Sequence, residues 1–521
     1  MAFLILTHVI PVRRLTPPEI LSLQDTGPFT RDPHRVKFIL DPDNCRANLD
    51  KWMLESMGFL KQAMRRSNIT DPRLLSVAKI ARSQAGRPQV DPGGRTHFDI
   101  LKPLLNVDTK SHADGVEIVD YCFDNLLPGD PAAQQVALMF DALPLNVSRR
   151  MCDPLAARMA PVAVLCRGDG QSLVTISRER KIHKSTTDTF PRVVPVNGGF
   201  HSCGHFSFGC NEGFHDMKYG RTKTLLSKEK VPKHIPNFEN DSYMHCTTHI
   251  RDDLIGTLAY FLRHVQKPAP ELLLDDPVAY LGQIKSAGGV AAFESMRYSG
   301  IPGSHYIRCA RASEGEKVPE LEAYAFHVMR AWAHKPVEAK ILLISLLSTE
   351  ATHPKIADVV KHSQFFSALG REGSSMFLDR ALEGVNLYQD QRRGRFSAFE
   401  TALEYTPAMS AFMHVCHALE AAEHGDNAAS DPLRESTINA ANVICEDLVK
   451  RLGVDLTIPD ETNPLFHTGG APNVVRSTSG LSHRPEEFIW RVALGQSLGA
   501  GRGGKPEHWA RYVDRFIPMI M

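Results

Sequence analysis

The chain lacks three features that would each assign it to a particular class of protein: a long apolar run, paired cysteines and an excess of one charge. No stretch reaches the roughly 18 apolar residues that a membrane-spanning helix needs, so we expect no membrane partner. The ten cysteines include no CxxC pair. Disulfide-rich secreted domains are shorter and denser in cysteine, so we expect reduced thiols and an intracellular protein.

The first residues, Met1–Leu6, are apolar but lack the basic segment and the cleavage site of a secretory signal. Lys plus Arg number 60 against 59 for Asp plus Glu. Binding of nucleic acid would therefore have to come from a local basic patch. An apolar fraction of 43% with 23% charged residues excludes wholesale disorder, and 521 residues are enough for several domains.

Periodicity and Pro/Gly punctuation divide the chain into four regions with different secondary structure. We predict a mostly helical region over 1–130, an α/β core over 131–250, a helical domain over 251–455, and a loop followed by helices over 456–521. Apolar residues at three-to-four spacing predict helices over Ala47–Arg66, Leu321–Ala333, Val337–Leu347 and Ser374–Tyr388. Asp43 or Asn44 is the expected N-cap of the first of these helices.

Short apolar runs over Val136–Phe140, Val162–Cys166 and Arg192–Val196 predict buried strands in the α/β core. Asp141 and Asp169 each follow such a strand. Carboxylates aimed by strand ends are what a site with two Mg²⁺ ions requires. The alternative is that both residues begin turns, where Asp is common.

The segments Gly168-Asp169-Gly170-Gln171-Ser172, Phe190–His201 and Leu378–Asn386, together with Arg178 and Arg180, form an ordered series. The series resembles the GDxQ(S/T), R and hydrophobic-P-x-x-G-x-x-H stretch, and the helical D-x-x-x-E-x-x-N segment, of a family of eukaryotic mobile-element proteins. That family is of undetermined activity and is related to transposases with an RNase H-like core. The resemblance covers about residues 135–205 and 375–390.

The resemblance implies an RNase H-like fold and a Mg²⁺-dependent phosphodiester nuclease or strand-transfer activity on DNA, in the nucleus. Asp141, Asp169 and Glu383 would be the three metal-binding carboxylates, and His201 would orient a phosphate or a water beside them. Asp379, one turn before Glu383, competes for the third position. Only 27 residues separate Asp141 from Asp169, so a shortened and inactive relative stays open as an alternative.

A His/Cys cluster provides a second hypothesis. Cys203, His205, Cys210 and His215 lie within a Gly-rich segment, which we interpret as a loop. Thiolates and imidazoles are the ligands that Zn²⁺ prefers, so these four residues are candidates for a zinc site. The alternative is interior cysteines beside aromatic residues, with ordinary hydrogen-bonded histidines.

Basic residues flank the predicted core and are the candidates for contact with nucleic-acid phosphates. They are Arg178, Arg180, Lys181, Lys218, Arg221, Lys223, Arg392 and Arg393. The sequence thus leaves three hypotheses open: a nuclease, a non-catalytic nucleic-acid-binding or helical scaffold protein, and a zinc-stabilised interaction protein. Convergence of Asp141, Asp169 and Glu383 would favour the first.

Overall fold

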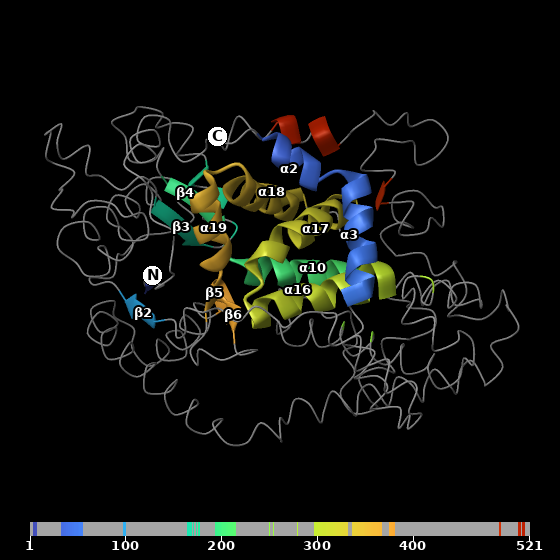
Figure 1. The fold of residues 1–521 in the computed structure, drawn as a ribbon, viewed down its shortest axis with the longest axis horizontal. Helices are drawn as coiled ribbons and strands as arrows, with labels where there is room; N and C mark the ends of the chain where they lie inside the picture. Colours follow the sequence, from blue (N-terminus) through green and yellow to red (C-terminus); the bar gives the residue numbers. More distant parts are fainter. Residues whose placement is uncertain are drawn as a thin grey trace, which may run out of the picture.

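The computed structural model describes a helical body with short strand pairs (Figure 1). The described residues are 4–7, 33–55, 97–100, 164–168, 170, 173–174, 176–177, 193–214, 250, 254, 279, 296–331, 336–366, 375–380, 489–490, 509–511 and 513–515. Most of these residues are helical, and the strands within them form three two-stranded pairs. None of the helices in this part of the chain combines the length and apolar composition needed to cross a lipid bilayer.

Helices α17 (Val318–Ala331) and α18 (Pro336–Glu350) pack against each other and form the centre of the body. Every residue of α18 from Ile341 to Glu350 is buried. A helix that is apolar on nearly all sides must be enclosed by neighbours, and α18 contacts α17, α19, α2 and strand β4. Pro319 and Pro336 occupy first-turn positions, where a proline costs no helical hydrogen bond.

Helices α10 (Gly199–Phe214) and α16 (Ile301–Ala312) form a layer on α17, and a π-helical turn, η2 (Met296–Gly300), leads into α16. Aromatic rings fill the space between them. Phe206 of α10 lies 6.0 Å from Tyr306 of α16 and 5.9 Å from Tyr324 of α17, measured between ring centroids. All three side chains are fully buried.

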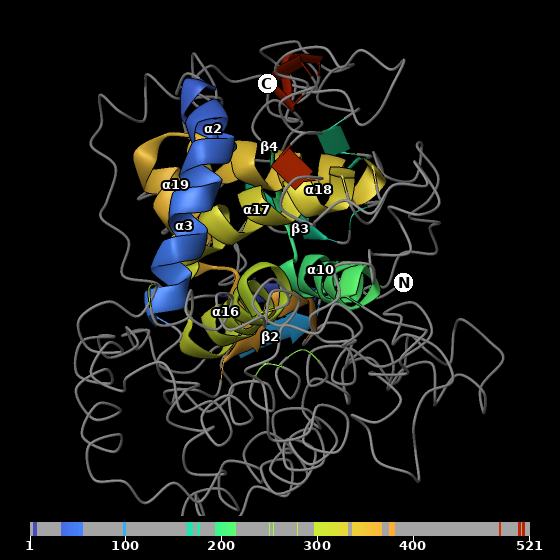
Figure 2. The ribbon, with the colours of Figure 1, turned by 90° about the vertical axis from the view of Figure 1, so that its right-hand side faces the viewer.

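Helices α2 (His34–Ile39) and α3 (Pro42–Glu55) cover one side of this body, and α3 crosses from α2 to the α16 layer (Figure 2). Ion pairs hold α3 in place along its length. Asp50 lies 2.8 Å from Arg297, and Glu55 lies 2.8 Å from Lys317. The α3 backbone is also fixed, because Nε2 of buried His305 hydrogen-bonds to the carbonyl oxygen of Trp52 at 2.9 Å.

The strand pairs are β1 (Leu4–Thr7) with β2 (His97–Ile100), β3 (Val164–Gly168) with β4 (Val193–Asn197), and β5 (Phe365–Phe366) with β6 (Met376–Phe377). The first and third pairs are antiparallel and the second is parallel. Strands β3 and β4 lie at the end of the helical body away from α3 (Figure 1). There β4 packs against α18, and Ser348 of α18 donates a hydrogen bond to the Pro195 carbonyl.

Two of the predicted strands, Val162–Cys166 and Arg192–Val196, are confirmed with shifts of one or two residues, and they pair with each other. The predicted helices over 321–333 and 337–347 are also confirmed as α17 and α18. The first predicted helix begins earlier, at Pro42. Its cap is Asp41 rather than Asp43 or Asn44, because Asp41 Oδ1 accepts the backbone N–H groups of those two residues.

Two predictions of local structure are wrong. The segment read as a Gly-rich loop is helix α10, because Cys203, Phe206 and Cys210 recur at three-to-four spacing and bury one face. The helix predicted over 374–388 begins later than predicted. Met376–Phe377 is strand β6, held by a Phe377–Phe365 stack at 5.7 Å, and helical residues begin at Leu378.

Helix α19 (Pro354–His362) packs on α18 and on η3 (Gly315–Lys317), a short 3-10 turn between α16 and α17. Gly315 makes this approach possible. A Cβ atom at that position would lie 2.3 Å from the Lys361 carbonyl oxygen, which no side chain tolerates. The chain reaches Gly315 through Ser313, whose φ of 53° ends α16 in a left-handed conformation.

Residues near the C-terminal end of the sequence pack on the same body. Trp490 and Trp509 are buried, and both rings lie within 6.4 Å of the His327 ring of α17. Lys37 of α2 forms an ion pair with Asp514 at 2.6 Å. Described residues from each of the four predicted regions therefore pack in one helical body.

Candidate functional site

The candidate site lies where the parallel strands end. In the β3–β4 register Gly168 lies opposite Asn197, so both strands finish at the same edge. The chain leaves β4 through Gly198 and begins α10 at Gly199, with no loop between them. The carboxyl ends of parallel strands are where α/β proteins commonly place ligands and reacting groups.

Asp379 supplies the carboxylate at this edge. Its Oδ1 accepts the backbone N–H of Phe200 at 3.0 Å, and its Oδ2 accepts the backbone N–H of His201 at 3.2 Å. The first amides of a helix have no partner within the helix and carry partial positive charge. Asp379 is therefore the N-cap of α10, supplied from a segment 179 residues away from Phe200.

Two glycines make room for this remote cap. A Cβ at Gly198 would lie 2.4 Å from the Cβ and Cγ atoms of Asp379, and a Cβ at Gly199 would lie 2.5 Å from the Phe377 ring. Gly198 has the position from which a side chain normally caps a helix. The Asp379 side chain occupies the space that such a side chain would need.

His201 joins the same group through its side chain. Its Nδ1 atom lies 3.3 Å from Asp379 Oδ2. The imidazole is 28% exposed whereas the Asp379 carboxylate is 6% exposed, so the histidine lies between the buried carboxylate and solvent. A carboxylate at Nδ1 fixes the ring orientation and favours a tautomer whose Nε2 accepts protons.

A second hydrogen bond ties the strand end to the helix. Asn197 donates from Nδ2 to Ser202 Oγ at 2.6 Å, and both side chains are buried. The strand end, the first turn of α10 and the segment around residue 379 are thus fixed relative to one another. Such fixation is what a site needs to hold one side chain in a defined direction.

The structure brings two predicted residues together, His201 and the competing candidate Asp379. The others at this site, Asp141, Asp169 and Glu383, lie outside the described residues. So do His215 and all eight basic residues predicted to contact nucleic acid: Arg178, Arg180, Lys181, Lys218, Arg221, Lys223, Arg392 and Arg393. Their roles stay predictions.

The predicted zinc ligands that are described share helix α10. Cys203 and Cys210 are buried on one face, and His205 Nε2 lies 3.6 Å from Glu338 Oε1 of α18. Burial raises the pKa of the Cys210 thiol far above its usual value, which opposes the thiolate form that binds metal. Within the described residues these three side chains belong to no group of converging ligand atoms.

The capping role of Asp379 was not predicted. The sequence does carry a signal for a missing cap, because Gly198, directly before α10, offers no side chain to the first amides of the helix.

Comparisons of the chain with protein-family models, with curated proteins and with solved structures found no match.

Proposed function

We propose that the chain is a transposon-derived, RNase H-like protein that cleaves or joins phosphodiester bonds with Mg²⁺ at the edge where β3 and β4 end. One observation carries the proposal. The hydrogen bonds from Phe200 and His201 to Asp379 join the two segments, about 135–205 and 375–390, that resemble the mobile-element family. Segments that are distant in sequence but form one site are expected when both belong to the same active centre.

The strand arrangement supports the same location. Asp169 is the next residue in the sequence after Gly168, the last residue of β3. Glu383 follows Asp379 by one helical turn in the sequence, and helical residues begin at Leu378. The proposal assigns both carboxylates to this edge, where His201 is held.

The contacts that each carboxylate already makes decide which residues would hold the metal. Both oxygens of Asp379 accept backbone amides, and the side chain is almost fully enclosed. A Mg²⁺ ion keeps several waters and needs accessible carboxylate oxygens. Asp379 therefore fits as the residue that positions His201, whereas Asp141, Asp169 and Glu383 are proposed as the ligands. When bound, Mg²⁺ would stabilise negative charge that develops on the phosphate.

His201 then has a defined task. With Nδ1 turned to Asp379, its Nε2 is proposed to hold the attacking water or a phosphate oxygen of DNA. The basic residues predicted around the core would neutralise flanking phosphates. Binding to DNA is thus expected to weaken steeply as salt rises. We propose a nuclear site of action, which the family resemblance implies.

Cleavage assays on the full chain test the proposal. Supercoiled plasmid and short duplexes would be incubated with Mg²⁺ or Mn²⁺, using wild type, Asp169→Ala and Asp41→Ala. We expect metal-dependent cleavage that Asp169→Ala abolishes. Asp41 caps α3, which is not part of this edge, so Asp41→Ala controls for a general loss of stability. Cleavage that survives in Asp169→Ala would exclude the assigned site.

A non-catalytic nucleic-acid-binding or helical scaffold protein is the second candidate, and one observation favours it. The described carboxylate at this edge, Asp379, is fully used in capping α10, which is a structural role. The same samples separate the candidates. Salt-dependent DNA binding without cleavage in any metal would support the binding protein, and the absence of both would leave the scaffold.

A further inference from the structure

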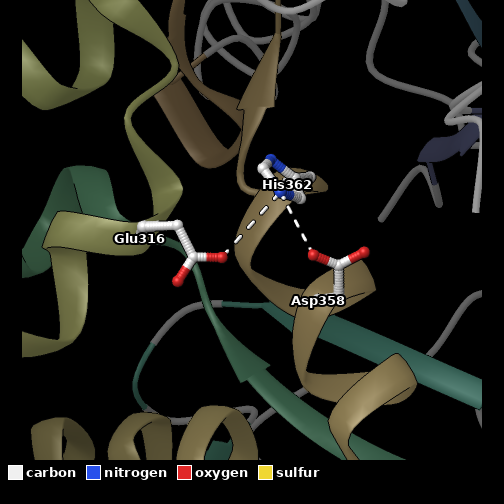
Figure 3. A group of neighbouring side chains, drawn as sticks. All are labelled: Glu316, Asp358 and His362. Carbon is white, nitrogen blue, oxygen red and sulfur yellow. Dashed lines mark ion pairs between the residues drawn. The ribbon is translucent and has the colours of Figure 1, made fainter. Parts of the chain in front are cut away.

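A second group of metal-ligating side chains lies outside the strand edge, where η3 meets α19. Glu316 comes from η3, and Asp358 and His362 are four residues apart on α19. One ligand atom from each of the three side chains lies within 4.8 Å of the other two. In Figure 3 the His362 ring lies between the two carboxylates, and an oxygen of each faces it.

We propose that Glu316, Asp358 and His362 bind a divalent transition-metal ion, with Zn²⁺ as the representative ion. His362 Nε2 lies 3.3 Å from Asp358 Oδ1 and 4.0 Å from Glu316 Oε1. Ligands placed 2.0–2.2 Å from a tetrahedral zinc are about 3.3–3.6 Å apart. The first separation already matches, and the second is about half an ångström too long. The ligand oxygens of Glu316 and Asp358 lie within 4.8 Å of each other, so the exposed Glu316 side chain would have to move toward both partners to complete the geometry.

The imidazole distinguishes this group from the carboxylate clusters that are common on protein surfaces. One nitrogen and two carboxylate oxygens suit zinc and its neighbours in the first transition series, whereas Mg²⁺ and Ca²⁺ prefer oxygen alone. The i, i+4 spacing places Asp358 and His362 on one face of α19, so two of the three ligands are aligned by the helix itself. Three protein ligands leave a position for water or for a small anion.

Glu316 is held by contacts that involve neither Asp358 nor His362. Lys361, whose side chain is 11% exposed, lies 2.9 Å from Glu316 Oε2 and 3.2 Å from Glu350 Oε1. Lys361 therefore binds one oxygen of Glu316 while the other, Oε1, faces His362. The close packing of Gly315 on the Lys361 carbonyl fixes the backbone on which Glu316 is carried.

Charge limits the affinity but does not remove the attraction. The Lys361 ammonium repels a cation, yet it is balanced by Glu350, a buried carboxylate that also pairs with Arg35. With Arg35 and Lys361 set against Glu350, Glu316 and Asp358, the group keeps one net negative charge, and Glu316 and Asp358 supply the oxygens that face the metal position. A bound ion would connect η3 to α19 and so stabilise the contact between them.

Calorimetric titration of ZnCl₂ into the reduced full chain tests the inference, because it counts bound equivalents against the background of other histidines and cysteines. We expect His362→Ala and Glu316→Gln each to bind one equivalent fewer than wild type. His34→Ala, which removes an exposed histidine on α2, is the matched control and should leave the stoichiometry unchanged. Equal stoichiometry for wild type and His362→Ala would overturn the proposal.

Thermal unfolding distinguishes a metal site from a plain ion-pair triad built on a protonated His362. In the metal site, Zn²⁺ raises Tm of wild type by more than it raises Tm of His362→Ala, and the two proteins unfold within about a degree of each other in EDTA. In the ion-pair triad, His362→Ala lowers Tm in EDTA, and Zn²⁺ shifts both proteins equally. That second pattern contradicts the proposal. Because Mg²⁺ does not enter these measurements, their result is independent of the nuclease assay.

Discussion

The α17–α18 pair and the junction between β4 and α10 are both buried, but different interactions hold them. The helix pair is built from apolar side chains at regular spacing, and α18 is enclosed along most of its length. The junction is built from a carboxylate, two backbone amides, an imidazole and two glycines. Apolar packing tolerates substitutions of similar volume, whereas the junction depends on individual atoms.

The two N-caps show the same contrast on a smaller scale. Asp41 caps α3 from the position directly before the helix, and its Oδ1 accepts the N–H of Asp43 at 2.9 Å. Asp379 makes the equivalent contacts with α10 from a segment far along the chain. A local cap forms with its helix, but a remote cap forms only when the tertiary structure is complete. An intact remote cap therefore indicates that the tertiary structure has formed.

Truncation inside the helix pair should give the largest loss of stability. Leu343→Ala removes a fully buried side chain from α18, and we expect the free energy of unfolding to fall by about 4 kcal/mol. Val337→Ala is the matched control on the same helix, because Val337 is 60% exposed, and it should cost less than about 0.5 kcal/mol. Urea denaturation followed by circular dichroism measures both. Similar losses for the two variants would mean that α18 is not enclosed.

Removal of the remote cap should have a somewhat smaller effect. Asp379→Ala leaves one buried and one part-buried amide without their acceptor, and we expect a loss of about 2–3 kcal/mol. Asp41→Ala removes a cap at a more exposed helix end and should cost about 1 kcal/mol. Asp379→Asn keeps an acceptor oxygen and should fall between wild type and Asp379→Ala. If Asp41→Ala is the more damaging of the two alanine variants, the junction has no special role.

The sequence predicts the α17–α18 pair much better than it predicts the junction between β4 and α10. Spacing of Leu321, Tyr324 and Val328 is sufficient to predict α17, and apolar residues at three-to-four spacing over Val337–Leu347 are sufficient to predict α18. Asp379 was identified as a candidate site residue from its helical neighbourhood. Its capping of α10 was not predicted, because no local pattern relates residues 179 positions apart.

The same limit applies to the group of Glu316, Asp358 and His362. The i, i+4 spacing on α19 is present in the sequence but is too common to indicate a site. Glu316 joins the pair only because Gly315 lets η3 approach α19. The error at α10 has a different origin, since the glycines and histidines of that segment suggested a loop while Cys203, Phe206 and Cys210 already carried helical spacing.

A buried histidine in the helical core should give a smaller effect than loss of the remote cap, and this effect is a change with pH. Burial lowers the pKa of His327 from 6.5 to about 4, and its Nε2 hydrogen-bonds to the Leu40 carbonyl at 2.7 Å. Between these pKa values the unfolded chain binds more protons than the folded one, so stability falls as pH decreases through this range. We expect His327 to account for about 1.5–2 kcal/mol of the stability difference between pH 7 and pH 5.

Substitution by a side chain that does not titrate isolates this contribution. His327→Gln keeps a donor for the Leu40 carbonyl, and its stability should change less between pH 7 and pH 5 than that of wild type. Buried His305, whose pKa burial lowers to about 3, contributes a similar dependence in both proteins and does not enter the difference. Denaturant titrations at the two pH values provide the measurement. Parallel pH dependences for wild type and His327→Gln would show that His327 does not titrate on unfolding.

The ion pair between Lys37 and Asp514 and the stacking of Arg46 over Trp490 have a consequence for synthesis of the chain. Helices α2 and α3 leave the ribosome early, but these partners are made more than four hundred residues later. At roughly 5–20 residues per second, the delay lasts tens of seconds. Trp52 of α3 likewise lacks its ring partners His305 and Tyr324 until they are made, so the early helices are the segment on which a chaperone is expected to act.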